Sequence, residues 1–390
     1  MSRTKFKEGF DMFARLAATH LKSLSRQFPS VTIVGPRQSG KTTLAQTTFP
    51  NYGYVSLEDP DARRHALTDP HGFFESYPAP LIIDEVQRVP DLLSYLQGVM
   101  DKTGKNGQYV LTGSHQPRLK AEISQSLAGR TALLKLLPPS FEELKKAGFR
   151  QSRDEWMYRG FMPRIYDQNM EARLLYKSYF ETYVQRDVQQ LINIKDQSKF
   201  ELFVRLLAGR VGQVASLQSL SGEIGVSAVT LNSWLSILES SYIVFRLFPY
   251  YKNLGKRLVK SPKIYFSEVG LASYLLGIQN SSQVAQHPLC GNLFENMVVA
   301  DLMKRKLNRG EDPNLYYYRD SRQLEVDVVE EAGAELSAFE IKSSFTANKD
   351  FVANLHELCK LSPNVKSCAV VYSGKPIKSL AGCSFVNYEG

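Results

Sequence analysis

The sequence predicts an α/β protein with a parallel, doubly wound sheet first, a helical middle part next and a second α/β domain at the end. Two observations lead to this prediction. Short apolar runs alternate with helix-length segments over the first third of the chain, and β-like runs return after about residue 260. Alternating strands and helices are typical of parallel sheets with helices on both faces. A chain of 390 residues is long enough for two or three such domains.

The first part contains five short apolar runs that we expect to be strands. They are Val31–Val34, Tyr54–Leu57, Leu81–Ile83, Tyr109–Leu111 and Ala132–Leu136. Pro138 and Pro139 then interrupt the pattern, so we place the end of the first domain near residue 140.

The remaining chain changes its periodicity twice. From Ser140 to about Leu247 the pattern is helical, and one helical face, interpreted as core, carries Tyr176, Tyr179, Phe180 and Tyr183. The later β-like runs are Lys263–Phe266, Leu315–Tyr318, Glu325–Val329, Ala338–Ile341 and Ala369–Tyr372. The expected domains are therefore residues 1–140, 141–200, 201–255 and 256–390.

Composition excludes several classes of protein. Hydrophobic residues make up 43% and charged residues 22% of the chain, as in an ordinary globular protein. No stretch approaches the roughly 20 apolar residues that cross a bilayer, so we expect no integral membrane association. The four cysteines form no C-x-x-C pair and the basic N-terminus lacks an apolar signal core, which favours a cytoplasmic location. The formal net charge of +9 permits a polyanionic partner such as nucleic acid.

The first motif matches G-x-x-x-x-G-K-[ST] between an expected strand and an expected helix, the context of a phosphate-binding loop. Backbone N–H groups and the helix N-terminus bind phosphates there. We therefore expect ATP and Mg²⁺ as cofactors, with Lys41 on the β- and γ-phosphates and Thr42 on the metal ion. The expected nucleotide-binding residues are Gly35, Pro36, Arg37, Gln38, Ser39, Gly40, Lys41, Thr42 and Thr43.

Polar residues also follow the third and fourth expected strands. Asp84 is suited to hold the same Mg²⁺ through water, and Glu85 to polarise the attacking water as catalytic base. Ser114 follows the next strand, where its hydroxyl would position the water or sense the γ-phosphate; the alternative is a helix-capping serine.

Arg130 precedes the fifth expected strand. An arginine at the subunit edge can enter a neighbour's nucleotide site and stabilise charge on the transferring phosphoryl group. Acting in trans would require a ring or another head-to-tail homo-oligomer. The alternative is a surface or salt-bridging arginine.

These motifs together resemble an AAA+-type ATPase. Two longer blocks, Tyr-Phe-Glu-Thr-Tyr-Val-Gln-Arg-Asp (179–187) and Ser-Pro-Lys-Ile-Tyr-Phe-Ser-Glu-Val-Gly-Leu (261–271), are similar to bacterial and archaeal AAA family ATPases with a DUF4143 domain. The resembling segments extend over nearly the whole chain and imply a P-loop AAA+-type sheet followed by a DUF4143 domain. The family usually has Asp-Thr-Gly where this chain has Glu268-Val269-Gly270, which keeps a carboxylate on a longer side chain.

Residues 217–248 predict a winged helix. Leu217–Ile224 reads as one helix, Gly225 as a turn, Ala228–Glu239 as a second helix capped by Ser227, and Tyr242–Phe248 as the wing. The second helix offers no Lys or Arg, which argues against sequence-specific reading of DNA. Basic residues and tyrosines interleave after it, at Arg246, Tyr250, Tyr251, Lys252, Lys256, Arg257 and Lys260. This pattern favours contact with phosphates, and a packing or oligomerisation module is the alternative.

The last part carries a second group of carboxylates. In an antiparallel hairpin Asp327, Glu340 and Lys342 share one face, because strand side chains alternate. Carboxylates with a lysine can bind Mg²⁺ and act on a phosphodiester. With Glu295 on a preceding helix the set resembles the PD-(D/E)xK nuclease core, which implies a restriction-endonuclease-like α/β domain with Asp327 and Glu340 as metal ligands. A solvent-facing hairpin or an inactive nuclease fold is the alternative.

Three functional hypotheses result. The first is a Mg²⁺-dependent ATPase coupled to a C-terminal module that binds, and in its strongest form cleaves, DNA. The second is an ATP-dependent oligomeric switch that binds a protein partner and has an inactive nuclease-like fold. The third is a nuclease whose phosphate loop is only structural.

Overall fold

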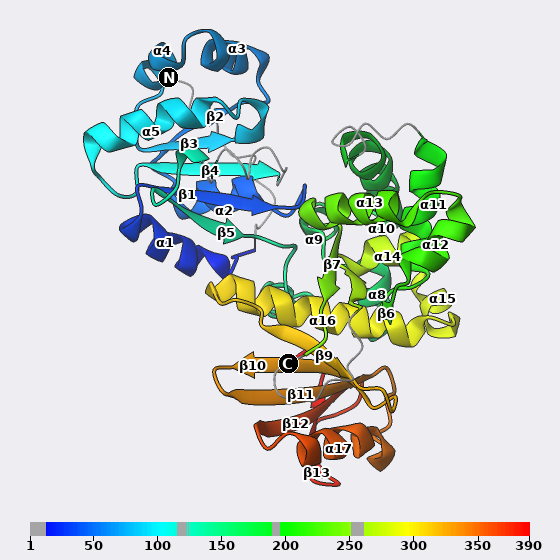
Figure 1. The fold of residues 1–390 in the computed structure, drawn as a ribbon. Helices are drawn as coiled ribbons and strands as arrows, with labels where there is room; N and C mark the ends of the chain where they lie inside the picture. The colour runs from blue at the N-terminus through cyan, green and yellow to red at the C-terminus, as the bar shows by residue number, and fades with distance from the viewer. Residues whose placement is uncertain (1–12, 115–122, 124, 189–195, 251–260) are drawn as a thin grey trace.

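The computed structural model describes residues 13–114, 123, 125–188, 196–250 and 261–390, with side chains of 185–188 left out. Figure 1 shows three parts: an N-terminal sheet with helices on its faces, a helical middle and a C-terminal sheet. Helix α16 (Cys290–Arg309) runs between the two sheets and contacts both, so it ties the ends of the chain together (Figure 1).

The N-terminal sheet is fully parallel, with strand order β2-β3-β4-β1-β5. Its strands are β1 (Ser30–Gly35), β2 (Gly53–Ser56), β3 (Leu81–Asp84), β4 (Tyr109–Ser114) and β5 (Thr131–Lys135). Its helices are α1 (Ala17–Gln27), α2 (Lys41–Thr48), α3 (Pro60–Thr68), α4 (Pro70–Ser76) and α5 (Leu92–Thr103), with a 3₁₀ turn at Val86–Arg88. The five expected strands and the parallel α/β fold are confirmed. Because all five strands point the same way, the residues that follow β1, β3 and β4 meet at one edge.

Sequence explains why these elements form. β1 reads Ser-Val-Thr-Ile-Val-Gly and is buried along its whole length, as a central parallel strand covered on both faces must be. Helix α3 begins at Pro60 after Asp59, whose carboxylate accepts hydrogen bonds from two backbone N–H groups of the first turn.

The middle part is helical and contains the expected helix–turn–helix. Gly225 ends α12 (Leu217–Ile224) in the left-handed conformation, and the Ser227 hydroxyl caps α13 (Ala228–Ser240). The remaining helices are α7 (Phe141–Lys146), α8 (Arg153–Arg159), α9 (Pro163–Asp167), α10 (Ala172–Tyr179), a π-helix (Phe180–Val188) and α11 (Gln197–Ala208). The four aromatic residues of the predicted stripe are buried in one core, as expected.

A three-stranded sheet with order β6-β8-β7 closes the helix–turn–helix. Its strands are β6 (Gln213–Val214), β7 (Val244–Leu247) and β8 (Lys263–Phe266), all antiparallel. The expected boundary after residue 255 falls between β7 and β8, so one sheet contains chain from both sides of it. The basic residues 252, 256, 257 and 260 and Tyr251 lie outside the described residues.

The C-terminal sheet has six strands in the order β13-β14-β12-β11-β10-β9 and is mixed. Strands β9, β10 and β11 pair antiparallel, whereas β11, β12 and β14 pair parallel. Its strands are β9 (Leu315–Arg319), β10 (Glu325–Ala332), β11 (Glu335–Lys342), β12 (Val365–Tyr372), β13 (Ile377–Leu380) and β14 (Cys383–Asn387). The helices of this half are α14 (Val269–Leu275), α15 (Ser281–Gln286), α16, a 3₁₀ turn (Lys349–Val352) and α17 (Ala353–Leu361). Within the part of the chain that the structure describes, no helix has the length and apolar character needed to cross a membrane.

Candidate functional site

The phosphate loop connects β1 to α2. Gln38 (φ 62°) and Gly40 (φ 89°) adopt the left-handed conformation, which turns the loop back so that α2 begins at Lys41. Gly35 is required by packing, because a Cβ atom there would collide with the carbonyl oxygen of Leu136. Beneath the loop, Arg15 donates to the Ser39 carbonyl at 2.8 Å and to the Leu137 carbonyl at 2.7 Å.

Lys41 lies inside this loop and is 5% exposed. Its Nζ donates to the carbonyl oxygens of Gly35 at 3.2 Å and Pro36 at 2.7 Å. Burial lowers the pKa of Lys41 to about 8, and the nearby carboxylates of Glu85 and Asp84 oppose that shift. The ammonium group thus rests on neutral carbonyl groups within the loop.

Asp84 lies beside the first turn of α2 at the end of β3. Thr42 Oγ1 donates to Asp84 Oδ1 at 2.9 Å, the hydroxyl of Tyr54 donates to Oδ2 at 3.0 Å, and the hydroxyl of Thr112 also donates to Oδ1. Thr42 and Asp84, the two residues expected to hold Mg²⁺, are therefore in direct contact. The sequence prediction missed Tyr54 and Thr112, which reach Asp84 from the neighbouring strands β2 and β4.

Glu85 and Ser114 complete this edge of the sheet. Glu85 has a left-handed backbone (φ 55°), and its carboxylate accepts a hydrogen bond from the Gln87 amide. Burial raises the pKa of Glu85, which favours a proton-accepting role near neutral pH. Ser114 pairs with Gly35 in register, and its buried Oγ has no hydrogen-bond partner among the described residues.

These residues fit a nucleotide with Mg²⁺. Thr42 and Asp84 present two oxygen atoms, the ligand type that Mg²⁺ prefers. A buried lysine, a glycine-bearing loop at a helix N-terminus and an unsatisfied buried hydroxyl are the groups that a polyphosphate would engage.

Of the arginines expected near the nucleotide, Arg130 lies away from this edge, whereas Arg37 belongs to the phosphate loop itself. Arg130 precedes β5 at the opposite end of the sheet, where its guanidinium pairs with Asp101 at 2.6 and 3.0 Å. Arg37 stands over the Tyr183 ring, 5.3 Å from its centroid. In this single chain, therefore, Arg130 contacts Asp101 rather than the phosphate loop.

A second cluster lies on the C-terminal sheet. Val328 pairs with Phe339 between β10 and β11, which places Asp327 beside Glu340. Lys342 Nζ contacts Asp327 Oδ2 at 3.2 Å and also pairs with Glu340. The backbone N–H of Ile341 donates to Asp327 Oδ2 at 2.8 Å. The expected common face of Asp327, Glu340 and Lys342 is therefore present.

Lys263 was not predicted to belong to this cluster. Its Nζ lies 2.7 Å from Glu325 Oε1, 3.1 Å from Glu295 Oε1 and 3.9 Å from Asp327 Oδ1. The hydroxyl of Tyr265, two residues along β8, donates to Glu295 at 2.5 Å. Glu295 on α16 thus joins the cluster as expected, through contacts with β8.

The carboxyl groups of the cluster differ in the direction of their pKa shifts. Burial and the charge of Asp327 raise the pKa values of Glu295 and Glu340. Burial opposes the ionisation of Asp327, but Lys342 and Lys263 outweigh it and lower the pKa of that carboxyl. Among the described residues, no group of three or more His, Cys, Asp or Glu side chains is arranged to hold a metal ion.

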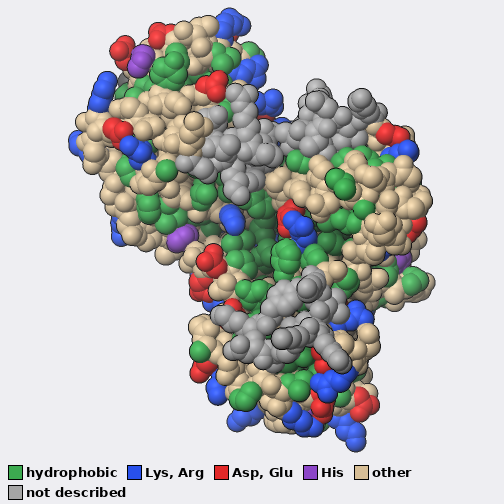
Figure 2. Space-filling view, in the orientation of Figure 1, with side chains coloured by type: hydrophobic (Ala, Val, Ile, Leu, Met, Phe, Trp, Pro, Cys, Tyr) green, Lys and Arg blue, Asp and Glu red, His purple; other side chains and the backbone are tan. Residues whose placement is uncertain are grey.

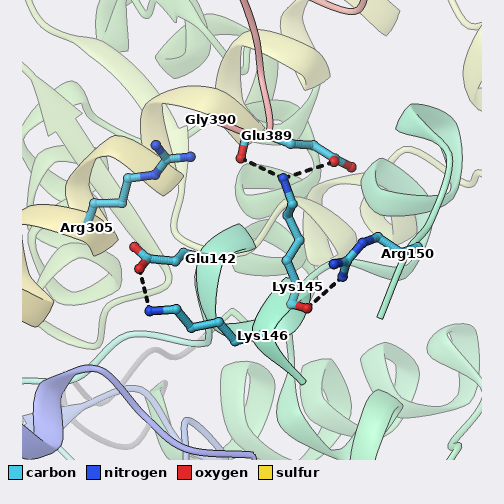
Figure 3. Close-up of a pocket in the computed structure, with 7 residues that line it drawn as sticks. All are labelled: Glu142, Lys145, Lys146, Arg150, Arg305, Glu389 and Gly390. Atoms are coloured by element: carbon cyan, nitrogen blue, oxygen red, sulfur yellow. Dashed lines mark hydrogen bonds and ion pairs between the residues drawn. The ribbon is translucent and has the colours of Figure 1, made fainter. Parts of the chain in front are cut away.

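A pocket apart from both sites opens between α7, α16 and the last residues (Figure 3). Its charges largely satisfy one another: Lys145 contacts the Glu389 carbonyl and carboxylate, and Lys146 pairs with Glu142. Figure 2 shows that positive and negative side chains are likewise interspersed over the lower, C-terminal part of the face drawn.

Comparisons with known families match three consecutive segments. Residues 27–145 match the AAA domain family, residues 150–282 match one domain of unknown function (DUF8612), and residues 290–388 match another (DUF4143). The chain is an AAA-domain protein with a C-terminal DUF4143 domain. These matches confirm the predicted combination of domains.

Similar proteins have been found in bacteria and archaea. The uncharacterized proteins Rv2008c of Mycobacterium tuberculosis and Mb2031c of Mycobacterium bovis are each 29% identical over 93% of this chain and 80% of their own length. Among solved structures, the Walker-type ATPase PABY2304 of Pyrococcus abyssi is 15% identical over 70% of this chain and 98% of its own, with a TM-score of 0.44. AMPPCP-bound DnaA from Aquifex aeolicus is 16% identical over 57% of this chain and 86% of its own, with a TM-score of 0.27.

Proposed function

We propose that this protein is a Mg²⁺-dependent ATPase whose nucleotide state is transmitted to its C-terminal domain. The observation that carries the proposal is the edge shared by β1, β3 and β4. There Asp84 is held by hydroxyl groups, Lys41 rests on loop carbonyls and the Ser114 hydroxyl has no hydrogen-bond partner among the described residues. An AAA domain with this loop supports ATP binding and hydrolysis.

Each residue has a task in this reaction. The loop N–H groups and Lys41 bind the phosphates, and Lys41 leaves the carbonyls of Gly35 and Pro36 to do so. When bound, Mg²⁺ supplies positive charge that neutralises the phosphate oxygens. Glu85 orients the attacking water and accepts its proton, and Ser114 donates to the γ-phosphate or to that water.

The test of this site is ATP turnover by purified protein. Lys41→Ala is expected to abolish measurable hydrolysis and to weaken ATP binding, whereas Lys102→Ala, a change on the exposed end of α5, retains both. Hydrolysis by Lys41→Ala at the rate of the unmodified chain would refute the proposal.

Arg130 is the proposed trans-acting residue of a homo-oligomer. Its position at the end of the sheet opposite the phosphate loop keeps it from the nucleotide of its own chain, which supports action on a neighbour. Mixing Lys41→Ala chains with Arg130→Ala chains tests this directly. At an interface between the two variants, the Arg130→Ala chain supplies an intact phosphate loop and the Lys41→Ala chain supplies an intact Arg130. Recovery of ATPase activity in the mixture is expected, and its absence would assign Arg130 to the surface pair with Asp101.

A second candidate function is the binding of DNA, with cleavage at Asp327, Glu340 and Lys342. Two observations favour it: the helix–turn–helix of α12 and α13, and the shared face of these three charged residues. The exposed face of α13 carries neutral Asn232 and Ser233, so backbone phosphates are the expected contacts.

DNA binding and cleavage are tested separately. Salt-sensitive binding of labelled duplex and single-stranded DNA is expected, since phosphate contacts release counterions. Mg²⁺-dependent cleavage that Asp327→Ala removes would establish the nuclease. ATP-dependent assembly without DNA binding or cleavage would instead assign the C-terminal part to recognition of a protein partner.

A further inference from the structure

The C-terminal cluster already contains a cation at its centre. Lys263 is 3% exposed and lies among the carboxylates of Glu295, Glu325 and Asp327, which come from α16 and β10. Its ammonium group also stands 5.5 Å from the Tyr317 ring centroid. A buried ammonium in contact with three carboxylates supplies the charge compensation that a bound cation would otherwise supply.

As these side chains lie, they do not fit a divalent metal. A metal ion between Glu295 and Asp327 would be forced against the Lys263 ammonium, at a separation where like charges repel strongly in a buried site. Lys342 meanwhile engages Asp327 and Glu340 from the other side. The cluster therefore differs from the phosphate-loop edge, where the donors to the Asp84 carboxylate, among the residues that the structure describes, are neutral hydroxyl groups.

Strand β8 joins this cluster to the phosphate loop. Lys263 begins β8, and Glu268 follows its end by two residues. Glu268 lines a small cavity together with Pro36 of the phosphate loop and Tyr179. Glu268 Oε1 accepts hydrogen bonds from the backbone N–H groups of Phe161 at 2.8 Å and Gly270 at 3.2 Å.

The strand can pass on a displacement because both of its ends are fixed by buried polar contacts. β8 pairs with β6 on one side and β7 on the other, which makes it the central strand of its sheet. The four residues of β8 cover roughly 13 Å at about 3.3 Å per residue. Because Pro36 and Glu268 line the same cavity, a shift of the phosphate loop changes the surroundings of Glu268, which lies two residues beyond the strand that begins at Lys263.

We propose that Lys263 is an internal cation that keeps divalent metal out of the C-terminal carboxylate cluster, and that ATP in the phosphate loop withdraws it through β8. The second half rests on the proposed function, since it requires ATP binding at Lys41. The first half is independent of ATP. The ligand that the opened cluster takes is a divalent cation with oxygen preference, such as Mg²⁺ or Mn²⁺.

Mn²⁺ binding to nucleotide-free protein, followed by electron paramagnetic resonance, tests the first half. Lys263→Met is expected to gain one Mn²⁺ site that Lys263→Met/Asp327→Asn lacks, with at least tenfold tighter binding than the unmodified chain shows there. Lys306→Met is the matched control: Lys306 also pairs with two carboxylates, Glu311 and Glu330, but outside the cluster.

Two results would overturn this half. One is an Asp327-dependent Mn²⁺ site in the unmodified, nucleotide-free protein, and the other is no gain in Lys263→Met. If Lys263→Met does not fold, Lys263→Met/Glu325→Gln removes one positive and one negative charge together and takes its place in the same assay.

A non-hydrolysable ATP analogue tests the second half. Its binding is measured in the same samples, so loss of nucleotide binding is seen separately from loss of coupling. In the unmodified chain the analogue is expected to add an Asp327-dependent Mn²⁺ site besides the one at the phosphate loop. Bound analogue with only the phosphate-loop Mn²⁺ would refute the link through β8.

Discussion

The phosphate-loop edge and the C-terminal cluster use the same residue types in opposite ways. At the first, Lys41 rests on neutral carbonyls and its pKa is lowered to about 8 by burial, while hydroxyls hold Asp84. At the second, burial opposes the charge of Lys263, but the carboxylates of Glu295, Asp327 and Glu325 outweigh it and raise its pKa. At the first site Lys41 makes no direct ion pair with Asp84, and a bound nucleotide with its metal ion would contact both. At the second site the lysines and carboxylates already form ion pairs with one another.

The largest effect expected from this contrast is on turnover at the first site. Glu85→Gln keeps the shape of the side chain but cannot accept the proton of water, so kcat should fall about 10²- to 10⁴-fold while ATP still binds. Glu75→Gln, on the exposed face of α4, is the control. Steady-state ATPase assays and nucleotide titration measure the two quantities, and an unchanged kcat would remove Glu85 as the base.

Loss of a carboxylate should reduce folding stability more at the C-terminal cluster than at the phosphate-loop edge. Asp327→Asn takes one partner from the buried Lys263 and one from the half-buried Lys342, which should lower the free energy of unfolding by about 3–5 kcal/mol. Asp84→Asn breaks no direct ion pair, since the hydrogen-bond donors to this carboxylate among the described residues are hydroxyls, and it should cost far less. Denaturant unfolding of both variants measures the difference. Equal losses would show that the C-terminal cluster is not held by its internal ion pairs.

The sequence revealed the first site more completely than the second for a physical reason. Gly35 to Thr42 are consecutive, so their pattern is visible along the chain. Asp327, Glu340 and Lys342 follow from strand alternation. Lys263 was recognised only as the start of a strand, because its partners lie 32 and more residues away and meet it through the packing of β8 on α16.

The same limit explains the other omissions. Tyr54 and Thr112 reach Asp84 only because β2 and β4 flank β3, an order that strand-sized runs do not encode. The boundary expected after residue 255 separated β7 from β8, since no local signal indicates that they pair. Helix ends were easier to predict from the sequence. Helix α12 has the expected bounds, and Ser216 and Gly225 cap its two ends.

The connection between the two sites can be disturbed at a glycine. Gly160 has φ 65° and ψ −155°, and a Cβ atom there would collide with Glu268 Oε1 and with the Tyr176 hydroxyl. Gly160→Ala should therefore destabilise the protein by about 1–3 kcal/mol more than Gly277→Ala, which shares the positive φ but has open space around it. Thermal unfolding of the two variants compares their stabilities. Equal effects would mean that the Glu268 side chain can move away from the added Cβ atom without loss of stability.

The smallest expected effect is a pH dependence at the first site. In the free protein the pKa of Lys41 is about 8, and bound phosphates favour its charged form, so ATP binding above that pH takes up a proton. The affinity for ATP should fall about tenfold per pH unit between roughly pH 8 and the pKa that Lys41 has in the ATP complex. One pH unit corresponds to about 1.4 kcal/mol of binding free energy. Calorimetric titrations in two buffers with different ionisation enthalpies measure the proton uptake directly. Lys102→Ala should show the same uptake, because its exposed ammonium lies away from the loop. Binding without proton uptake at pH 9 would mean that Lys41 keeps its proton on the loop carbonyls, and that the two lysines differ less than their surroundings indicate.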